Sequence, residues 1–252
     1  MTAPRISCVV PAYENLGLLA PCLASILAQR EIAFELIVTD DSPSRQVARH
    51  VAGLGERVVY REGARSGNPV DNWNLGLAAA RAPLHLLVHH DEMLTDPLYL
   101  RRAADALERT GAAASLAGVR VTGVDRPSRF ARVAPVISRL PGAEALLPAV
   151  NWIGPTAAFA FGAGHRFDPA FVQLADVEFY GRVLKTGPMV RLGGVSVGSL
   201  GHHGAQITAR IDPFDLARKE LRLLAERRPP EISPGAYRLC RAALSFRAKL
   251  RD

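Results

Sequence analysis

The chain has 252 residues, of which 48% are hydrophobic and 22% are charged, and these ordinary values exclude the disordered and fibrous classes. Its length allows one large α/β domain or two small ones. The formal net charge is +7, but no motif that reads DNA or RNA accompanies it, so we expect no nucleic-acid partner. The cysteines are odd in number and form no C-x-x-C pair, which favours a reducing compartment, the cytoplasm.

Strands and helices alternate in the first third of the chain. Strands are predicted at 5–12, 34–42, 57–60 and 83–88, and helices after residue 16 and over 71–81, where Asp71 is a candidate N-cap. This order favours a parallel sheet with right-handed crossovers.

The pattern is less regular after residue 95. We expect a helix near 97–109 and strands at 113–124 and near 189–200, separated by an uncharged segment at 145–164 and a segment at 167–187. The uncharged segment reaches membrane-spanning length, but its prolines and Gly154 argue against a transmembrane helix. The start of the chain also lacks the long apolar core of a signal peptide. We therefore expect one domain over 1–209.

A basic helical tail is predicted over 210–252. It holds eleven Lys and Arg against six Asp and Glu, which supplies +5 of the net charge. Asp212 before Pro213 and Ser233 before Pro234 are typical of helix starts. The last helix is basic and amphipathic, so it either contacts an anionic membrane surface peripherally or packs on its own domain with a solvated basic face.

Polar side chains follow three of the predicted strands, at residues 11–15, 40–41 and 89–92. The carboxyl ends of parallel strands meet at one edge of a sheet, where α/β proteins bind ligands. A carboxylate there can accept hydrogen bonds from a nucleobase or ribose, and another can bind a hard divalent cation. A nucleoside diphosphate would use both, with Mg²⁺ or Mn²⁺ across its phosphates.

Several familiar catalytic motifs are missing from the sequence. It contains no G-x-x-x-x-G-K-[ST] phosphate loop, no H-E-x-x-H and no G-x-S-x-G, and the segment GAGHRF at 162–167 lacks the third glycine of a dinucleotide fingerprint. Nucleotide hydrolysis by a P-loop, zinc proteolysis, α/β-hydrolase chemistry and nicotinamide redox chemistry therefore lose their usual sequence support.

Six segments, in order and spacing, resemble inverting family 2 glycosyltransferases of the bacterial surface-polysaccharide type. They are SCVVPAYEN, SILAQ, FELIVTDDS, NWNLGLAAARA, LLVHHDEML and ADVEFYGRVLKTG. The resemblance covers about residues 5–208 and implies the GT-A fold, an α/β, Rossmann-like, mixed and mostly parallel sheet flanked by helices. It implies a nucleotide-binding half over about 1–95 and an acceptor half over about 96–209. These enzymes move a sugar from a nucleotide sugar to an acceptor hydroxyl with inversion at the anomeric carbon.

The resemblance also implies nucleotide-binding residues. Pro11, Tyr13 and Glu14 would frame the nucleoside, and Tyr13 would stack on the base. Asp41 would contact the base, and Asp40 would assist it. The remaining candidates are Asn74 and Arg65, although a mobile loop arginine is the alternative for the second.

A metal and diphosphate site is implied at VHHDE, which occupies the place of the family's D-x-D motif. Asp91 would bind the metal, Mn²⁺ or Mg²⁺, with His89 at the first acidic position and His203 from GHHGAQIT at 201–208. Histidine brings no negative charge, so this site should bind the ion more weakly than two carboxylates would. His90, Glu92 and Gln206 would face the donor diphosphate.

The acceptor side is implied by ADVEF. Asp176 would be the general base that deprotonates the acceptor hydroxyl, with Glu178 as the second candidate. Ala175 stands where the family usually has a glutamate. Trp152 would stack on an acceptor sugar, or pack in the core instead.

The implied function is transfer of a sugar to a glycan or lipid-linked acceptor at the inner membrane face. One alternative remains open, and a second, nucleotidyl transfer, lacks sequence support. The histidine at the metal motif and Ala175 favour a non-catalytic nucleotide- or glycan-binding protein of the same fold. Nucleotidyl transfer to sugar phosphates would need a glycine-rich basic loop after the first strand, and PAYENLG does not provide one.

Overall fold

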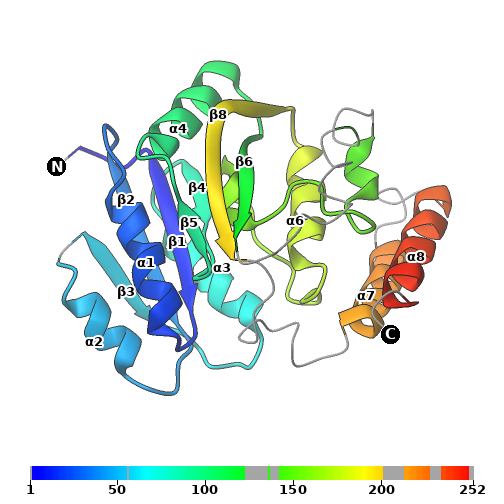
Figure 1. The fold of residues 1–252 in the computed structure, drawn as a ribbon, viewed down its shortest axis with the longest axis horizontal. Helices are drawn as coiled ribbons and strands as arrows, with labels where there is room; N and C mark the ends of the chain where they lie inside the picture. Colours follow the sequence, from blue (N-terminus) through cyan, green and yellow to red (C-terminus); the bar gives the residue numbers. More distant parts are fainter. Residues whose placement is uncertain are drawn as a thin grey trace.

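The computed structural model describes residues 2–55, 57–122, 136, 142–200, 213–227 and 234–249. Over these ranges the strands form one sheet of eight, in the order β3-β2-β1-β4-β7-β6-β8-β5 (Figure 1). The strands are β1 (Ile6–Ala12), β2 (Phe34–Asp40), β3 (Val58–Glu62), β4 (Leu84–Leu87), β5 (Glu92–Leu94), β6 (Ala114–Thr122), β7 (Phe159–Gly162) and β8 (Met189–Leu200).

Helices pack against this sheet and extend beyond one end of it. They are α1 (Leu16–Leu27), α2 (Gln46–Ala52), α3 (Pro69–Ala79), α4 (Tyr99–Thr110), α6 (Ala175–Leu184), α7 (Pro213–Arg227) and α8 (Pro234–Lys249), with short 3₁₀ turns η1 (Ala143–Leu146) and η2 (Thr156–Ala158). The last two helices lie side by side beyond α6 (Figure 1). In the described ranges no helix is both long enough and apolar enough to span a bilayer.

The first four predicted strands form a parallel unit, as their alternation with helices predicts. β1 pairs in parallel with both β2 and β4, and β2 pairs in parallel with β3. All seven residues of β1 are buried, which is typical of parallel strands covered on both faces. The parallel sheet predicted for this part of the chain is confirmed.

The second part of the sheet is mixed. β7 lies antiparallel between β4 and β6, β6 pairs in parallel with β8, and β5 pairs antiparallel with β8 at the far edge. Neither β5 nor β7 is predicted from the sequence, because three or four residues are too few to show a strand period. The whole sheet is nevertheless mixed and mostly parallel, as expected.

Helix α3 begins earlier than the sequence predicts. Asn68 is its N-cap, and the Asn68 side chain accepts a hydrogen bond from the Val70 N–H at 3.0 Å. Pro69 then occupies the first turn, a favoured place for proline. Asp71 instead accepts a hydrogen bond from the Ser66 hydroxyl at 2.7 Å. The prediction of Asp71 as N-cap is therefore wrong.

The tail helices begin at Pro213 and Pro234, as predicted. The N-cap candidates Asp212 and Ser233 lie outside the described residues. Buried apolar side chains of these helices belong to the same hydrophobic core as the sheet; they are Ala217, Leu221, Leu224 and Cys240. The described part of the tail therefore packs on the domain.

Candidate active site

Hydrogen bonds bring the carboxyl ends of β1, β2 and β4 together. The Asp41 N–H donates to the Ala12 carbonyl at 3.1 Å, and the Val88 N–H donates to the Val9 carbonyl at 2.9 Å. The buried amide of Asn72, from α3, donates to the Thr39 carbonyl at 3.2 Å and to that of Ala12 at 3.4 Å. The polar strand ends therefore converge on one edge of the sheet.

The two aspartates after β2 have different surroundings. Asp40 is buried, and its oxygens accept hydrogen bonds from the Ser42 N–H at 2.9 Å and the Tyr60 hydroxyl at 2.8 Å. Burial and this hydrogen bond raise the pKa of Tyr60 to about 12. Asp41 is only half-buried, and its Oδ1 accepts the N–H of Arg65 at 3.0 Å. Asp41 is thus better placed than Asp40 to meet a ligand.

Gly63 allows the loop after β3 to close over Asp41. A Cβ added at Gly63 would lie 2.0 Å from Oδ1 of Asp41 and 3.0 Å from Oδ1 of Asn72. Any other residue here would displace the aspartate. Gly63 and Asn72 are not among the residues predicted from the sequence, because neither belongs to a motif that indicates this contact.

Tyr13 and Glu14 follow β1 and behave differently. Tyr13 leaves 52% of its surface exposed, so its ring is free to stack on a flat apolar partner. The carboxylate of Glu14 accepts hydrogen bonds from the N–H and the hydroxyl of Ser44, at 2.9 and 2.8 Å. Glu14 therefore orders the loop after β2.

Other predicted nucleotide contacts are engaged within the protein. Pro11 is buried inside β1. The amide of Asn74 both donates to the carbonyl and accepts from the N–H of Phe167, at 2.8 and 2.9 Å. The guanidinium of Arg65 lies 2.8 Å from the carboxylate of Glu62, at an exposed position. Asn74 thus links α3 to the segment that precedes α6.

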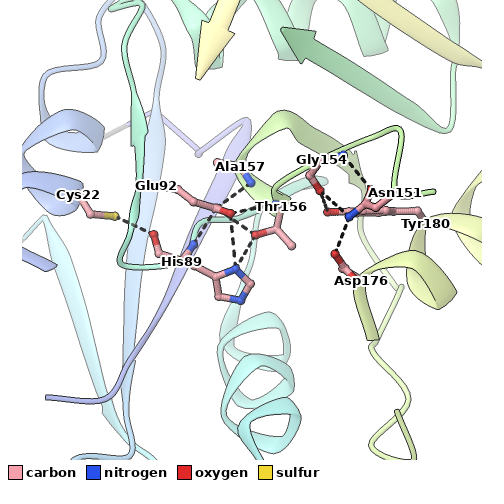
Figure 2. A network of polar contacts seen from close by, with 9 residues as sticks. All are labelled: Cys22, His89, Glu92, Asn151, Gly154, Thr156, Ala157, Asp176 and Tyr180. Atoms are coloured by element: carbon pink, nitrogen blue, oxygen red, sulfur yellow. Dashed lines mark hydrogen bonds and ion pairs between the residues drawn. The ribbon is translucent and has the colours of Figure 1, made fainter. Parts of the chain in front are cut away.

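Glu92 closes the turn of residues 89–92 and faces the interior. It is 3% exposed. Its carboxylate accepts the N–H groups of His89 at 3.0 Å, Thr156 at 3.2 Å and Ala157 at 3.0 Å, and the Thr156 hydroxyl at 3.1 Å (Figure 2). Glu92 therefore joins the turn to η2, and the structure does not turn it toward a donor diphosphate as the resemblance implies.

His89 lies beside Glu92 and against an aromatic ring. Its ring centroid is 4.8 Å from that of Trp73, and its buried Nε2 meets no hydrogen-bond partner among the residues that the structure describes. Burial by itself would lower the pKa of His89. The contact with Glu92 and the charges of Glu92, Asp91 and Asp176 outweigh burial, so the pKa is raised.

The residues expected to bind a metal come together only in part. Across the described ranges no three side chains of His, Cys, Asp or Glu lie close enough to hold an ion. Asp91 is half-buried in the turn, and its carbonyl accepts the N–H of Leu200 at 3.0 Å. His202, His203 and Gln206 lie outside the described residues. The described residues alone therefore do not supply a complete metal site.

Asp176 lies in the first turn of α6, half-buried. Its Oδ2 accepts a hydrogen bond from the Asn151 amide at 2.8 Å (Figure 2). Its Oδ1 accepts the Val177 N–H at 2.8 Å. Burial raises the pKa of Asp176 to about 6, although the backbone N–H groups of Val177 and of Asp176 itself and the charge of His89 act in the opposite direction. The electrostatic effect of His89 couples Asp176 to the turn at the carboxyl edge.

Asn151 holds Asp176 from a tight turn of residues 151–154. Its Oδ1 accepts the Gly154 N–H at 2.8 Å, and the Gly154 carbonyl accepts the Tyr180 hydroxyl at 3.2 Å. Gly154 has φ +93°, a conformation that favours glycine. The asparagine and the glycine of NWIG are a sequence signal for this turn, but no motif indicates that Asn151 contacts Asp176.

The other acceptor-side candidates are buried. Glu178 forms a two-point ion pair with Arg182, at 2.7 and 3.0 Å. Trp152 is 8% exposed, and its indole N–H donates to the Ala143 carbonyl at 2.9 Å. The structure therefore favours core packing for Trp152 over stacking on a sugar, and it leaves Asp176 as the more accessible of the two acids on α6.

The model of a known family matches much of this chain. It is described as glycosyl transferase family 2 and covers residues 7–166, more than half of the sequence. The chain belongs to this family. A Mycobacterium tuberculosis protein, itself uncharacterized, is 31% identical over an alignment of 203 residues that covers 72% of this chain. The chain spans 62% of that relative.

Solved structures of glycosyltransferases share the fold. Staphylococcus aureus TarS in complex with UDP-GlcNAc matches with a TM-score of 0.69 and 15% identity, over 88% of this chain and 66% of that one. The mannosyltransferase PcManGT from Pyrobaculum calidifontis, in complex with GDP-Man and Mn²⁺, matches with a TM-score of 0.66 and 18% identity, over 98% and 76%. These matches confirm the GT-A fold.

The family 2 match ends at residue 166, before α6. It includes Asp41, the turn of residues 89–92 and Asn151, but it does not include Asp176. In this member of family 2, Asp176 is therefore distinguished by the geometry around it and not by the family match.

Proposed function

We propose that this family 2 glycosyltransferase is an inverting enzyme that transfers a sugar from a nucleoside diphosphate sugar to a hydroxyl of a glycan or lipid-linked acceptor. The observation that carries the proposal is Asp176, a half-buried carboxylate with a pKa of about 6 that is held by Asn151 and coupled to the carboxyl edge of the sheet. A carboxylate that is ionised at neutral pH and more basic than usual suits general-base catalysis.

The proposed step balances as a single displacement. The acceptor oxygen attacks the anomeric carbon from the face opposite the diphosphate, and its proton moves to Asp176. The bond from the anomeric carbon to the diphosphate oxygen breaks, and its electron pair leaves with the nucleoside diphosphate. The hydrogen bond from Asn151 fixes one oxygen of Asp176 and so orients the carboxylate.

The donor would bind at the carboxyl ends of β1 and β2. Tyr13 offers an exposed ring for the base and Asp41 a half-buried carboxylate beneath Gly63. The nucleotide sugars bound in the TarS and mannosyltransferase structures support such a donor. The Mn²⁺ in the mannosyltransferase structure supports use of Mn²⁺ or Mg²⁺, for which Asp91 is the proposed ligand.

The cellular role belongs to the same proposal. We place the enzyme in the cytoplasm, at the inner membrane face, in synthesis of a bacterial cell-surface polysaccharide. The three cysteines are free and buried, which supports a reducing compartment. The eleven basic residues over 210–252 support a peripheral contact with anionic lipid.

The test compares two acids on one helix. Asp176→Asn should retain nucleotide affinity and lose transfer by at least about 100-fold, because Asn cannot accept the proton. Glu178→Gln should keep the wild-type transfer rate per folded molecule, since Glu178 is paired with Arg182. Full transfer by Asp176→Asn would refute the role of this residue, and loss of transfer only in Glu178→Gln would move the role to the second candidate.

A second candidate function is a binding protein of the same fold without turnover. Ala175 and the absence of three close metal ligands in the described ranges favour it. Donor hydrolysis or transfer that disappears in Asp91→Ala would exclude this alternative. Tight nucleotide binding without either reaction would support it.

A further inference from the structure

A buried carboxylate from α7 binds the backbone immediately before α6. Glu220 is 4% exposed. Its Oε1 accepts the N–H groups of Val172 at 2.9 Å and Gln173 at 3.2 Å, and its Oε2 accepts that of Leu174 at 2.7 Å. The chemistry proposed above uses none of these contacts.

The start of α6 depends on this outside carboxylate. Leu174 occupies the N-cap position and has no side chain that can cap the helix. N–H groups at a helix start need acceptors from elsewhere, and Glu220 supplies one to Leu174 from 46 residues further along the chain. Asp176 comes two residues after Leu174, so the backbone that Glu220 binds is the backbone that carries Asp176.

Helix α7 is itself fixed in place. Ala217, Leu221 and Leu224 are buried, and their spacing puts them on the same face of the helix as Glu220. Leu224 also lines a cavity of about 30 Å³ together with Val177 and Gly181 of α6. The carboxylate of Glu220 therefore projects from a packed helix that lies across this small cavity from α6.

We propose that Glu220 is a positioning residue, an α7 carboxylate that holds the start of α6 and thereby sets the place of the Asp176 carboxylate. The inference rests on the proposed function of Asp176. A general base must lie within hydrogen-bond reach of the acceptor hydroxyl, and a misplacement of about 1 Å can cost on the order of 100-fold in rate. By this reasoning the C-terminal helices are part of the catalytic framework.

The decisive variant is Glu220→Gln, which keeps the shape of the side chain. Either orientation of its amide turns an NH₂ group toward at least one backbone N–H that the carboxylate now accepts. We expect kcat to fall at least about tenfold, while KM for the donor and nucleotide affinity stay within about twofold. Glu226→Gln is the matched control, because Glu226 is exposed on the same helix, and its kcat should equal that of the wild type.

Hydrogen exchange of residues 172–178 gives a readout that needs no activity. In Glu220→Gln these amides should exchange faster, while exchange in β1 and β4 stays unchanged. A folded Glu220→Gln protein with wild-type kcat, or with unchanged exchange at the start of α6, overturns the proposal. A parallel loss of kcat, nucleotide affinity and melting temperature also overturns it, since that pattern indicates a merely structural role.

Failure of the two proposals can be told apart. If the wild-type chain transfers no sugar, the proposed function fails, and hydrogen exchange still decides whether Glu220 holds the start of α6. If Glu220→Gln does not fold, Glu220→Asp replaces it, because this variant keeps the charge and shortens the reach. Slower transfer with faster exchange at residues 172–178 is the result expected of either variant.

Discussion

The surroundings of Asp176 make its carboxylate more basic and make its ionisation cost free energy. Burial raises its pKa to about 6 from the ordinary 3.8. The folded protein therefore keeps a proton on this group at a higher pH than the unfolded chain does. Ionising Asp176 in the folded state costs free energy that is absent below the ordinary pKa, grows as pH rises to about 6, and is constant above.

The pH dependence of transfer should show this group. Because the base must be ionised, kcat/KM should fall about tenfold per pH unit below a pKa of about 6. Rates measured from pH 4.5 to 8.5 on wild type and on Glu178→Gln should share this acid limb. A flat profile in the wild type would contradict the assignment of the base.

The stability of Asp176→Asn should differ from that of wild type in a pH-dependent way. At pH 8 the variant should be more stable by at most about 3 kcal/mol, because Asn avoids the cost of ionisation. Near pH 4 the gain should vanish. Thermal unfolding at both pH values measures it, and Glu178→Gln, which breaks a buried ion pair with Arg182, should instead lose stability at pH 8.

Asn151 should tune the same carboxylate. Asn151→Ala removes an N–H donor that favours the ionised form of Asp176, so the pKa of Asp176 should rise and the acid limb of kcat/KM should move to higher pH. The same pH–rate series detects the shift. An acid limb at the wild-type position would indicate that Asn151 holds only the turn at Gly154.

Single residues also mark the limit of what the sequence could predict. The motif HHDE can be recognised in the sequence, but the sequence does not show which of its two acids faces inward. That depends on η2, where the N–H groups of Thr156 and Ala157 bind Glu92 although they lie 64 and 65 residues further along the chain. The partner of Asp176 was missed for a similar reason, since Asn151 is 25 residues distant in sequence. Motif spacing indicates chemistry, but contacts across such distances arise only when the chain folds.

Among the elements, α3 packs unusually close to the sheet. A Cβ added at Gly76 would lie 2.3 Å from Cγ1 of Val9 and 3.1 Å from Cγ2 of Thr39. Glycine costs helix stability relative to alanine, so its place inside α3 is explained by this close approach to β1 and β2. The same approach lets Asn72 reach the ends of both strands.

Two glycine substitutions should therefore have opposite effects. Gly76→Ala should lower stability by about 1–3 kcal/mol through overpacking. Gly181→Ala, inside α6 with open space around its added Cβ, should raise stability by up to about 1 kcal/mol. Urea unfolding of both variants measures the difference, and equal effects would argue against close packing of α3.

Elements with a long periodic pattern or a proline at their start were predicted well. The ranges of β1, β2 and α4, and the first residues of α7 and α8, were predicted within a few residues. The short strands β5 and β7 were missed, because their existence depends on antiparallel partners far along the chain rather than on local propensity. The early start of α3 was not predicted, because both Asn68 and Asp71 are residue types that favour the N-cap position, and Asp71 was chosen.

At the scale of the whole molecule, donor binding should stabilise the fold. A nucleoside diphosphate at about 100 times its Kd adds about 2.7 kcal/mol, or roughly 5–10 °C for a domain of this size. Thermal unfolding with UDP, GDP, dTDP and CMP, each with and without Mn²⁺, should identify one stabilising nucleotide. If Mn²⁺ increases the shift in melting temperature for wild type but not for Asp91→Ala, this result would support Asp91 as a metal ligand.

Thermal unfolding with the nucleotide also distinguishes Asp41, at the carboxyl ends of the strands, from Asp105, which lies in α4 near the opposite end of β1. Asp41→Asn should reduce the shift produced by the nucleotide, because Asp41 lies at the carboxyl edge beneath Gly63. Asp105→Asn should leave it unchanged, since Asp105 pairs with Arg5 at the start of β1. An equal shift in both variants would contradict the placement of the nucleoside at Asp41.

The position of β5 limits how this protein can be recombined with a relative. β5 begins at Glu92, the last residue of the turn of residues 89–92, yet it pairs with β8 at the far edge of the sheet. A chimera joined near residue 95 would therefore set a strand from one parent against an unrelated β8 from the other. Chimeras that exchange acceptor specificity should fold more often when β5 and β8 come from the same parent. This requires the first junction to lie before residue 92.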